Sequence, residues 1–210
     1  MTELILVRHG QTAWNMSEIF RGRIDIDLDD VGLKQVELLG EHLADRKIEA
    51  VYSSPLQRAV KTAKAIASRH KLEVKITPGL IDFDFGKWEG LSVPEVKEKF
   101  PVEFAEWAKN PHLVRVPGGD SLDDVTRRGM AVVAEAVGKH KDTIVLVSHR
   151  VVSRILMLAM LGLDNSHFWN IRQDTASITI FDYENGRYIL SQHNDTSYLK
   201  PLQGTKVKGF

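Results

Sequence analysis

The sequence has no cysteine, no long hydrophobic run and no excess of either charge among its 210 residues. Without cysteine, the chain has no disulfide framework, no thiolate zinc site and no cysteine nucleophile. The apolar run at residues 4–7 is far too short to span a membrane or to form the hydrophobic part of a signal peptide. We therefore expect neither a disulfide-stabilised protein nor a membrane protein, and we expect a cytoplasmic location.

The formal net charge of the chain is zero, because it has 28 lysines and arginines and 28 aspartates and glutamates. This balance favours neither nucleic acid nor an anionic membrane as the main partner, although it allows a local cationic site. Hydrophobic residues make up 43% of the chain and charged residues 27%, as in ordinary globular domains. The length, without any linker-like tract, predicts one domain over residues 1–210.

Strand-like and helix-like segments alternate along the chain. Short apolar runs indicate strands at residues 4–7, 49–52, 74–76 and 144–147, and a final hairpin is expected from residues 178–181 and 187–191. Apolar residues at helical spacing indicate helices at residues 31–46, 57–69 and 151–161, with a further helix from Ser121. The apolar face expected for the helix at residues 31–46 consists of Leu33, Val36, Leu39 and Leu43. That of the helix at residues 151–161 consists of Val152, Ile155 and Ala159. This order predicts the α/β class, as a three-layer α/β/α sandwich whose mostly parallel sheet has an antiparallel edge.

Residues 83–119 break this alternation. They are rich in aromatic side chains, with Trp88 and Trp107 among them. Ser92, followed three residues later by Glu95, is typical of the start of a helix. We interpret the segment as a mainly helical insertion packed over one end of the sheet.

Two of the predicted strands end in similar polar residues. The first strand is followed by Arg8-His9 and the late one by Ser148-His149. Because ligands bind beyond the carboxyl ends of parallel strands, we expect the two histidines to emerge together at such a site. A single histidine at a strand end is as often structural as functional. The pair, with Arg8 beside it, favours a cationic or nucleophilic site.

These residues are part of motifs that resemble those of a known family. Leu6-Val-Arg-His-Gly-Gln-Thr12, followed by Asn15, is similar to the signature of the histidine phosphatase superfamily, which includes the cofactor-dependent phosphoglycerate mutases. Ser53-Ser-Pro-Leu-Gln-Arg58-Ala-Val-Lys-Thr62 resembles the family's second arginine motif, and residues 80–90 resemble its acid motif. Residues 117–121 and 147–149 match later landmarks. Several motifs in family order over nearly the whole chain are far more specific than any one of them.

The resemblance implies a phosphoglycerate mutase-like fold and transfer of a phosphoryl group to His9 and then to water, without a metal or other cofactor. Attack on a phosphate monoester needs donors that neutralise charge on its oxygens. Arg8 and Arg58 have planar donor forks that suit phosphate. His149 is implied to donate a further hydrogen bond, close to the N-terminus of the helix that follows it.

The resemblance also implies a general acid, which protonates the leaving alkoxide and then deprotonates the attacking water. Its position is four residues before Gly86, where most relatives have glutamate and this chain has Asp82. Asp82 keeps the carboxyl chemistry but is shorter by one methylene group. Asp84 and Glu89 are rival candidates.

Four further residues are candidates for substrate binding: Asn15, Arg21, Gly22 and Arg150. Asn15 is expected to steady the phosphate or the first loop, or to act only as a helix cap. Arg21-Gly22 falls where relatives often have Gln-Gly beside the substrate. Arg150, where many relatives have glycine, either adds a positive charge that favours a substrate with a second anionic group or points away. The other histidines lack partners at ligand spacing, so we expect no metal site.

The favoured function is hydrolysis of a small phosphate monoester, and the resemblance to phosphoserine and α-ribazole phosphatases does not separate the two. Residues 83–119 are then the lid and specificity element. The first alternative is a phosphoglycerate mutase, although the mutases of the family are longer and have a larger insertion and tail that protect the phospho-enzyme from water. The second alternative is a non-catalytic protein that binds a phosphorylated ligand. The expected partner is a small phosphorylated metabolite, and the sequence leaves a homodimer open.

Overall fold

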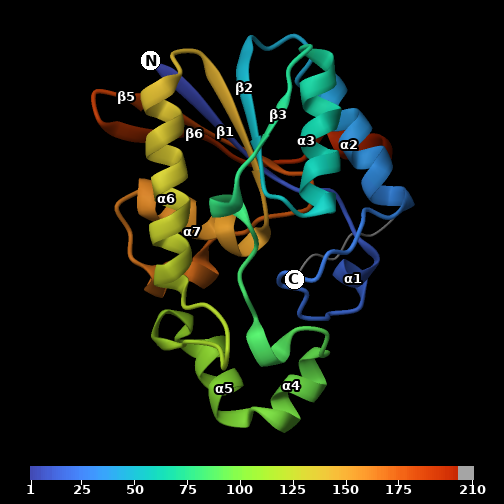
Figure 1. Ribbon diagram of the computed structural model, residues 1–210, viewed down its shortest axis with the longest axis vertical. Helices are drawn as coiled ribbons and strands as arrows, with labels where there is room; N and C mark the ends of the chain where they lie inside the picture. Colours follow the sequence, from blue (N-terminus) through green and yellow to red (C-terminus); the bar gives the residue numbers. More distant parts are fainter. Residues whose placement is uncertain (203–210) are drawn as a thin grey trace.

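The computed structural model describes residues 1–202, except for the side chain of Met16, so residues 203–210 of the predicted domain lie outside the described part. Figure 1 shows a central sheet with helices on both sides. Its strands are β1 (Thr2–Arg8), β2 (Ile48–Ser53), β3 (Val74–Ile76), β4 (Thr143–Ser148), β5 (Ile178–Glu184) and β6 (Arg187–Asp195). The strand order is β3-β2-β4-β1-β5-β6; the first four strands are parallel to one another, and β5 and β6 are antiparallel to their neighbours. The predicted mostly parallel sheet with an antiparallel edge is confirmed.

The central strands are buried on both faces because their apolar residues run continuously. Successive side chains point to opposite faces of a strand, so Ile5 and Val7 face one hydrophobic cluster while Leu4 and Leu6 face the other. Each such side chain contributes about 1.5–3 kcal/mol when it is removed from water. The sheet is thus held by two cores at once.

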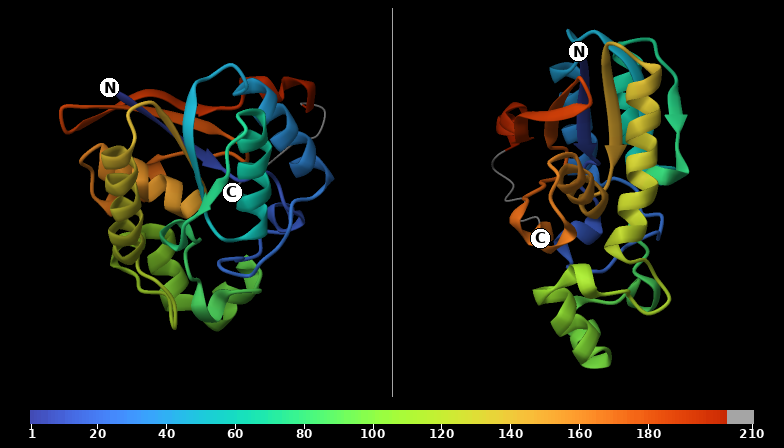
Figure 2. Two further views of the ribbon diagram at one scale, coloured as in Figure 1. Left: turned by 45° about the horizontal axis from the view of Figure 1, so that its top comes forward. Right: turned by 90° about the vertical axis from the view of Figure 1, so that its left-hand side faces the viewer.

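Four helices complete the two outer layers, as the views in Figure 2 show. On one face, α2 (Asp30–His42) and α3 (Gln57–Arg69) share a hydrophobic cluster with the sheet. On the other face, α6 (Leu122–Lys139) and α7 (Arg150–Met160) do the same. The predicted three-layer α/β/α sandwich is therefore confirmed.

Two predicted details of the helices are wrong. Leu33 is 46% exposed, whereas Val36, Leu39 and Leu43 are buried. At about 100° per residue, Leu33 lies roughly a quarter of a turn away from the mean direction of the other three and leaves the apolar stripe. Ala159 of α7 is only half-buried.

The insertion at residues 83–119 contains the helices expected for it, α4 (Val93–Lys99) and α5 (Pro101–Lys109). They lie beyond the carboxyl ends of β1 and β4, at the lower end of the molecule in Figure 1. The Ser92 hydroxyl accepts from the Glu95 amide, and the Glu95 carboxylate accepts from the Ser92 amide at 2.8 Å, which is the predicted capping box. Trp88 is fully buried, and its ring packs against those of Phe20 and of Phe104 in α5.

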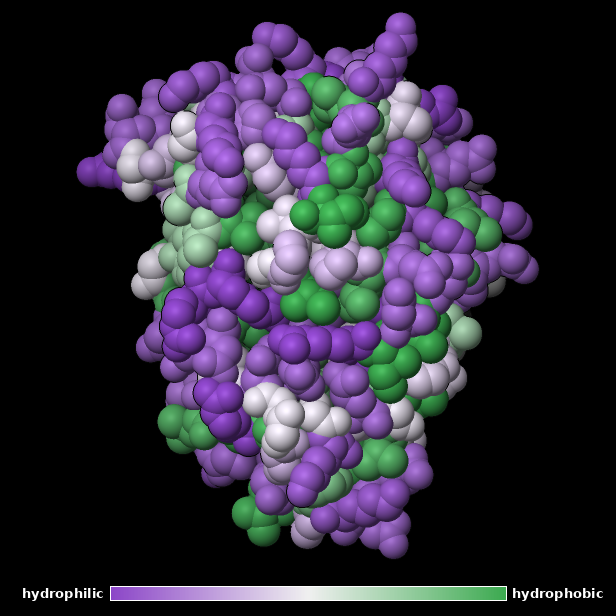
Figure 3. All heavy atoms as spheres, in the orientation of Figure 1, coloured by the Kyte–Doolittle hydropathy of each residue, from purple (hydrophilic) through white to green (hydrophobic). Residues whose placement is uncertain are grey.

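Hydrophilic side chains predominate on the face of the molecule in Figure 3, with smaller hydrophobic areas among them. The described residues include no helix that is long and apolar enough to cross a membrane.

Candidate active site

The two strand-end histidines meet at the lower edge of the sheet. β1 and β4 are adjacent and parallel, with Arg8 in register with Ser148, so the residues that follow them emerge side by side. The rings of His9 and His149 have centroids 5.2 Å apart, and both are buried. The structure therefore brings together the pair that the strand ends predict.

The hydrogen bonding of His9 fixes which of its nitrogens has a free lone pair. Nδ1 of His9 lies 2.7 Å from the carbonyl oxygen of Gly10. A carbonyl only accepts hydrogen bonds, so Nδ1 must carry the proton and Nε2 must be unprotonated in the neutral ring. Burial, and then the nearby positive charge of Arg58, hold the pKa of His9 well below its ordinary value. His9 is therefore a neutral imidazole with an available Nε2 near neutral pH.

His149 is held between two oxygen-bearing side chains. Its Nε2 lies 2.7 Å from the hydroxyl of Ser54, and its Nδ1 lies 3.4 Å from Oδ2 of Asp82. Burial, followed by the charge of Arg58, also lowers the pKa of His149 well below its ordinary value. Sequence reasoning missed Ser54, which lies within the second arginine motif but gives no signal of its own that it contacts His149.

Arg58 is fully buried and tied to three oxygens. It donates to Oδ2 of Asp82 at 3.1 Å, to the Gly22 carbonyl at 2.8 Å and to the Ile24 carbonyl at 2.9 Å. Arg8, also buried, donates to the carbonyl of Gln173 at 2.5 Å. Within residues 1–202, the Nε atoms of both arginines are buried without a hydrogen-bond partner. Unsatisfied guanidinium donors beside the two histidines suit an anion.

Positive charge is concentrated around these residues. Burial, and then repulsion by Arg58, lowers the pKa of Arg21 to about 9. Burial, and then repulsion by Arg154, lowers the pKa of Arg150 to about 10. The pKa of Arg8 is also lowered, first by burial and then by Arg150. Crowded buried cations that repel one another are stabilised when an anion binds among them.

Of the three candidate carboxylates, Asp82 is the one beside the histidines. Its Oδ1 accepts from its neighbour's amide, that of Phe83, at 2.9 Å, and its Oδ2 lies near Arg58 and His149. Asp84 instead accepts from the Gly86 amide at 2.8 Å and pairs with Arg23 at 3.1 Å.

The third candidate, Glu89, is used to hold a turn. Its Oε1 accepts from the Arg23 amide at 2.7 Å. Burial raises the pKa of Glu89. Gly22, in this turn, has a φ of +50°, and a Cβ there would lie 1.9 Å from the Glu89 carboxylate. The turn therefore requires glycine at position 22. The carbonyl of Gly22 accepts a hydrogen bond from Arg58.

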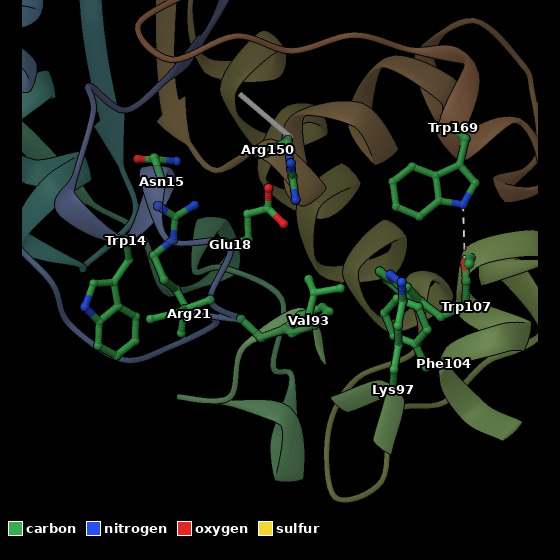
Figure 4. A pocket seen from close by; sticks show the side chains of 13 residues that line it. Trp14, Asn15, Glu18, Arg21, Val93, Lys97, Phe104, Trp107, Arg150 and Trp169 are labelled. Carbon is green, nitrogen blue, oxygen red and sulfur yellow. Dashed lines mark hydrogen bonds between the residues drawn. The ribbon is translucent and has the colours of Figure 1, made fainter. Parts of the chain in front are cut away.

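Two adjoining cavities open at this edge of the sheet. The smaller, of about 40 Å³, is lined by His9, Arg21, Gly22, Asp82 and Arg150, among other residues. The larger, of about 380 Å³, is shown in Figure 4. Ile19, Phe20, Arg21 and Arg150 line both cavities. Trp14, Glu18, Lys97 and Trp169 line the larger one, and sequence reasoning missed all four because they come from separate segments without a motif.

Asn15 acts as a helix cap and also lines the larger cavity. Its Oδ1 accepts from the amide of Thr12 at 2.8 Å at the start of α1 (Ala13–Met16). Arg21 donates to the hydroxyl of the same Thr12 at 2.8 Å. Asn15 and Arg21 are therefore both tied to the loop that follows His9.

His140 is one of the six other histidines and belongs to a separate network. Its ring lies 2.7 Å from a Glu49 oxygen and 2.9 Å from the Tyr52 hydroxyl. Nowhere in residues 1–202 do three or more histidine, aspartate or glutamate side chains gather in a way that could hold a metal ion.

Comparison with known proteins identifies the family. The family model of the histidine phosphatase superfamily (branch 1) matches residues 4–196. The chain is 39% identical over 200 residues to phosphoserine phosphatase 1 of Hydrogenobacter thermophilus, a match that covers 95% of each chain. The chain belongs to the histidine phosphatase superfamily. The predicted enzyme class, a phosphoric monoester hydrolase, is confirmed for this histidine phosphatase.

Solved histidine phosphatase structures share the fold. YhfR of Bacillus stearothermophilus superimposes with a TM-score of 0.91 at 28% identity, covering 95% of this chain and all of that one, 100%. Phosphoserine phosphatase of Entamoeba histolytica, in complex with 3-phosphoglyceric acid, gives a TM-score of 0.84 at 27% identity and covers 95% of this chain and 100% of that chain. The two phosphoserine phosphatases support a small phosphorylated metabolite as the kind of substrate.

Proposed function

We propose that this histidine phosphatase hydrolyses its phosphate monoester through a phosphohistidine formed on Nε2 of His9. The observation that carries the proposal is the 2.7 Å contact between Nδ1 of His9 and the Gly10 carbonyl. This contact leaves Nε2 as the nucleophile, and His9 lines the same cavity as Asp82. The low pKa of His9 keeps that nitrogen unprotonated at neutral pH.

The proposed reaction has two steps. In the first, Nε2 of His9 attacks phosphorus, the bond from phosphorus to the ester oxygen breaks, and protonated Asp82 transfers its proton to the leaving alkoxide. In the second, Asp82 removes a proton from water, the water oxygen attacks phosphorus, and the bond to His9 breaks. Inorganic phosphate leaves, and both residues return to their starting states.

The cations of the site stabilise the transferring group. Arg8, Arg58 and His149 are proposed as the clamp on the phosphoryl oxygens, which is supported by their burial beside His9 and by the unsatisfied donors of both arginines. Arg21 and Arg150 are proposed to bind the substrate where the two cavities join.

The larger cavity supports a place for the alcohol part of the ester. We assign residues 83–119 the role of lid and specificity element within a single domain, because Val93, Lys97, Phe104 and Trp107 of this insertion line that cavity. The relatives named phosphoserine phosphatase support hydrolysis rather than mutase activity.

Trapping of the phospho-enzyme tests the proposal. Wild-type protein is mixed with a ³²P-labelled phosphate monoester, quenched in alkali and digested, and label is expected on the peptide that contains His9. The His9→Ala variant is expected to lose activity by several orders of magnitude, since removal of a covalent nucleophile can cost about 10⁶-fold. His167→Ala, with a half-exposed side chain, is the matched control.

Near wild-type turnover by the His9→Ala variant would contradict the mechanism. Phosphate release and isomerised product are measured in the same reactions with a chelator present. Isomerisation as the main outcome would indicate a mutase, and binding without turnover would indicate a binding protein.

A further inference from the structure

We propose that the larger cavity is a binding site for a ring-bearing alcohol, so that the favoured substrates are phosphate monoesters of alcohols with a flat apolar ring. The inference rests on the proposed function, because it needs the phosphate to bind beside His9. It assigns the alcohol part of the ester to a particular set of aromatic side chains. It therefore predicts a preference for such esters over phosphoserine.

The cavity is lined mainly by aromatic and aliphatic side chains. Figure 4 shows Trp14 and Trp169 on opposite sides of it, with Phe104 and Trp107 nearer to Trp169. Phe20 completes the aromatic lining. A cavity of about 380 Å³ has the size and the apolar character of sites that hold small organic ligands.

The indole of Trp169 is held in place although it is 42% exposed. It packs edge-to-face on the buried Trp107, with centroids 6.1 Å apart, and its Nε1 donates to the Trp107 carbonyl at 3.3 Å. The guanidinium of Arg154 lies over the Trp169 ring, 5.4 Å from its centroid. A large apolar surface that is fixed and left open to a cavity is a preformed wall for a ligand.

Four charged side chains line the cavity, and two of them lie at its phosphate end. Arg21 and Arg150 lie where the larger cavity joins the smaller one. Lys97 is engaged with the Phe104 ring, whose centroid is 5.3 Å from its Nζ. Glu18 is the one carboxylate that lines this cavity among the described residues. One phosphate monoester can therefore span the two cavities, with its phosphate beside His9 and its alcohol among the aromatic rings.

A serine fits this cavity poorly. Its few heavy atoms fill a small share of about 380 Å³ and leave most of the aromatic lining without a contact. A ring fills more of the space, and aromatic pairs prefer the offset and edge-to-face contacts that Trp169 already makes with Trp107. The apolar walls thus gain contact area from a ring and little from an amino acid.

Three alkyl esters with leaving groups of similar chemistry test the inference: 2-phenylethyl phosphate, ethyl phosphate and O-phosphoserine. We expect kcat/KM for 2-phenylethyl phosphate to exceed that of each of the other two by about 10- to 100-fold, as expected for burial of one ring. In the Trp169→Ala and Trp14→Ala variants, the ratio of phenylethyl to ethyl ester is expected to fall several-fold. Val102→Ala changes a side chain of α5 that is 77% exposed and outside the cavity lining, and it should leave the ratio unchanged.

The outcomes separate this inference from the proposed function. If ethyl phosphate or phosphoserine is hydrolysed as efficiently as the phenylethyl ester, the ring site is wrong while the phosphatase reaction stands. An unchanged ratio in folded Trp169→Ala and Trp14→Ala proteins, checked by circular dichroism, also overturns it. If no ester releases phosphate, including 4-nitrophenyl phosphate, the proposed function itself has failed.

Discussion

Arg128 of α6 donates a hydrogen bond from Nη2 to the main-chain carbonyl of Asp82, at 3.0 Å. Its Nη1 donates to the carbonyls of Gly79, at 2.8 Å, and Ile81, at 2.5 Å, so one guanidinium holds the carbonyl of the proposed acid and two carbonyls that precede it. The Asp120 carboxylate accepts from Arg23 at 3.1 Å and lies 3.5 Å from Arg128. The main chain at Asp82 is therefore held by α6, through a residue that lines neither of the two cavities described above.

Replacement of Arg128 by alanine is expected to impair proton transfer by Asp82 more than substrate binding. A shift of about 1 Å in a catalytic group can cost about 100-fold in rate, so kcat for an alkyl ester should fall by about 10- to 100-fold. An aryl ester hardly needs the proton and should lose less. Steady-state kcat and KM for the two esters measure this difference.

Arg127→Ala is the matched control, because the adjacent Arg127 side chain is 76% exposed and pairs with Asp124. Arg128→Lys should recover part of the alkyl-ester rate. Equal losses for alkyl and aryl esters in Arg128→Ala would show a merely structural role.

Asp82→Asn is expected to slow hydrolysis of alkyl phosphates far more than that of aryl phosphates. An alkoxide needs a proton in the transition state, whereas an activated phenolate hardly does. Asp82→Glu keeps the carboxyl group, lengthens the side chain by one methylene group and should keep activity. Initial rates over a series of leaving groups provide the measurement.

Asp84→Asn and Glu89→Gln are the controls, since their carboxylates hold the Gly86 and Arg23 amides. If one of these two variants shows the leaving-group dependence and Asp82→Asn does not, the acid has been assigned to the wrong carboxylate.

Arg150→Ala is expected to weaken the binding of substrates that carry a second negative charge. Arg150 lies where the two cavities join. Loss of one charge-assisted hydrogen bond between its guanidinium and the substrate should lower kcat/KM by about 10- to 100-fold. The loss should be larger for 3-phosphoglycerate than for glycerol 3-phosphate, whose alcohol is neutral. Arg187→Ala, on the exposed β6 strand, is the control. Equal losses for both esters would mean that Arg150 acts on the shared phosphate.

A fall in pH should destabilise the folded protein over a pH range that the buried histidines determine. The pKa values of His9 and His149 are lowered in the folded state, so below about pH 6.5 the unfolded chain binds more protons than the folded one. The free energy of unfolding should therefore fall as the pH falls from 6.5 to 5, by up to about 1.4 kcal/mol per pH unit for each histidine.

Urea denaturation at several pH values measures that slope in buffers without phosphate. His149→Gln is expected to give a shallower slope than the wild type. His167→Gln, whose parent side chain is 43% exposed, should give the wild-type slope. Identical slopes for all three proteins would contradict the explanation.

Local sequence pattern was enough to predict the sheet and the histidine pair. A buried parallel strand has a strong apolar signature, and its end fixes where His9 and His149 emerge. The wrong orientation of Leu33 shows the limit of spacing alone, because a residue at the margin of an apolar stripe is decided by what packs there. Contacts between distant segments of the chain have no local signal in the sequence, because they exist only once the chain is folded. Examples are the contact of Ser54 with His149, that of Arg128 with the Asp82 carbonyl, and the position of Trp169 opposite Trp14.

The arrangement of the site separates two kinds of change during evolution. The proposed phosphoryl chemistry depends on residues at the ends of β1 and β4, where the backbone is hydrogen-bonded on both sides within the sheet. The larger cavity, proposed to hold the alcohol, is lined by residues of α1, α4, α5 and the short helix that contains Trp169, together with residues 18–21 and Arg150. Mutations in α4, α5 and the helix of Trp169 can therefore alter the ester that is accepted without changing a residue next to His9 or His149. A lineage can therefore acquire new substrates through its periphery while its reaction stays the same.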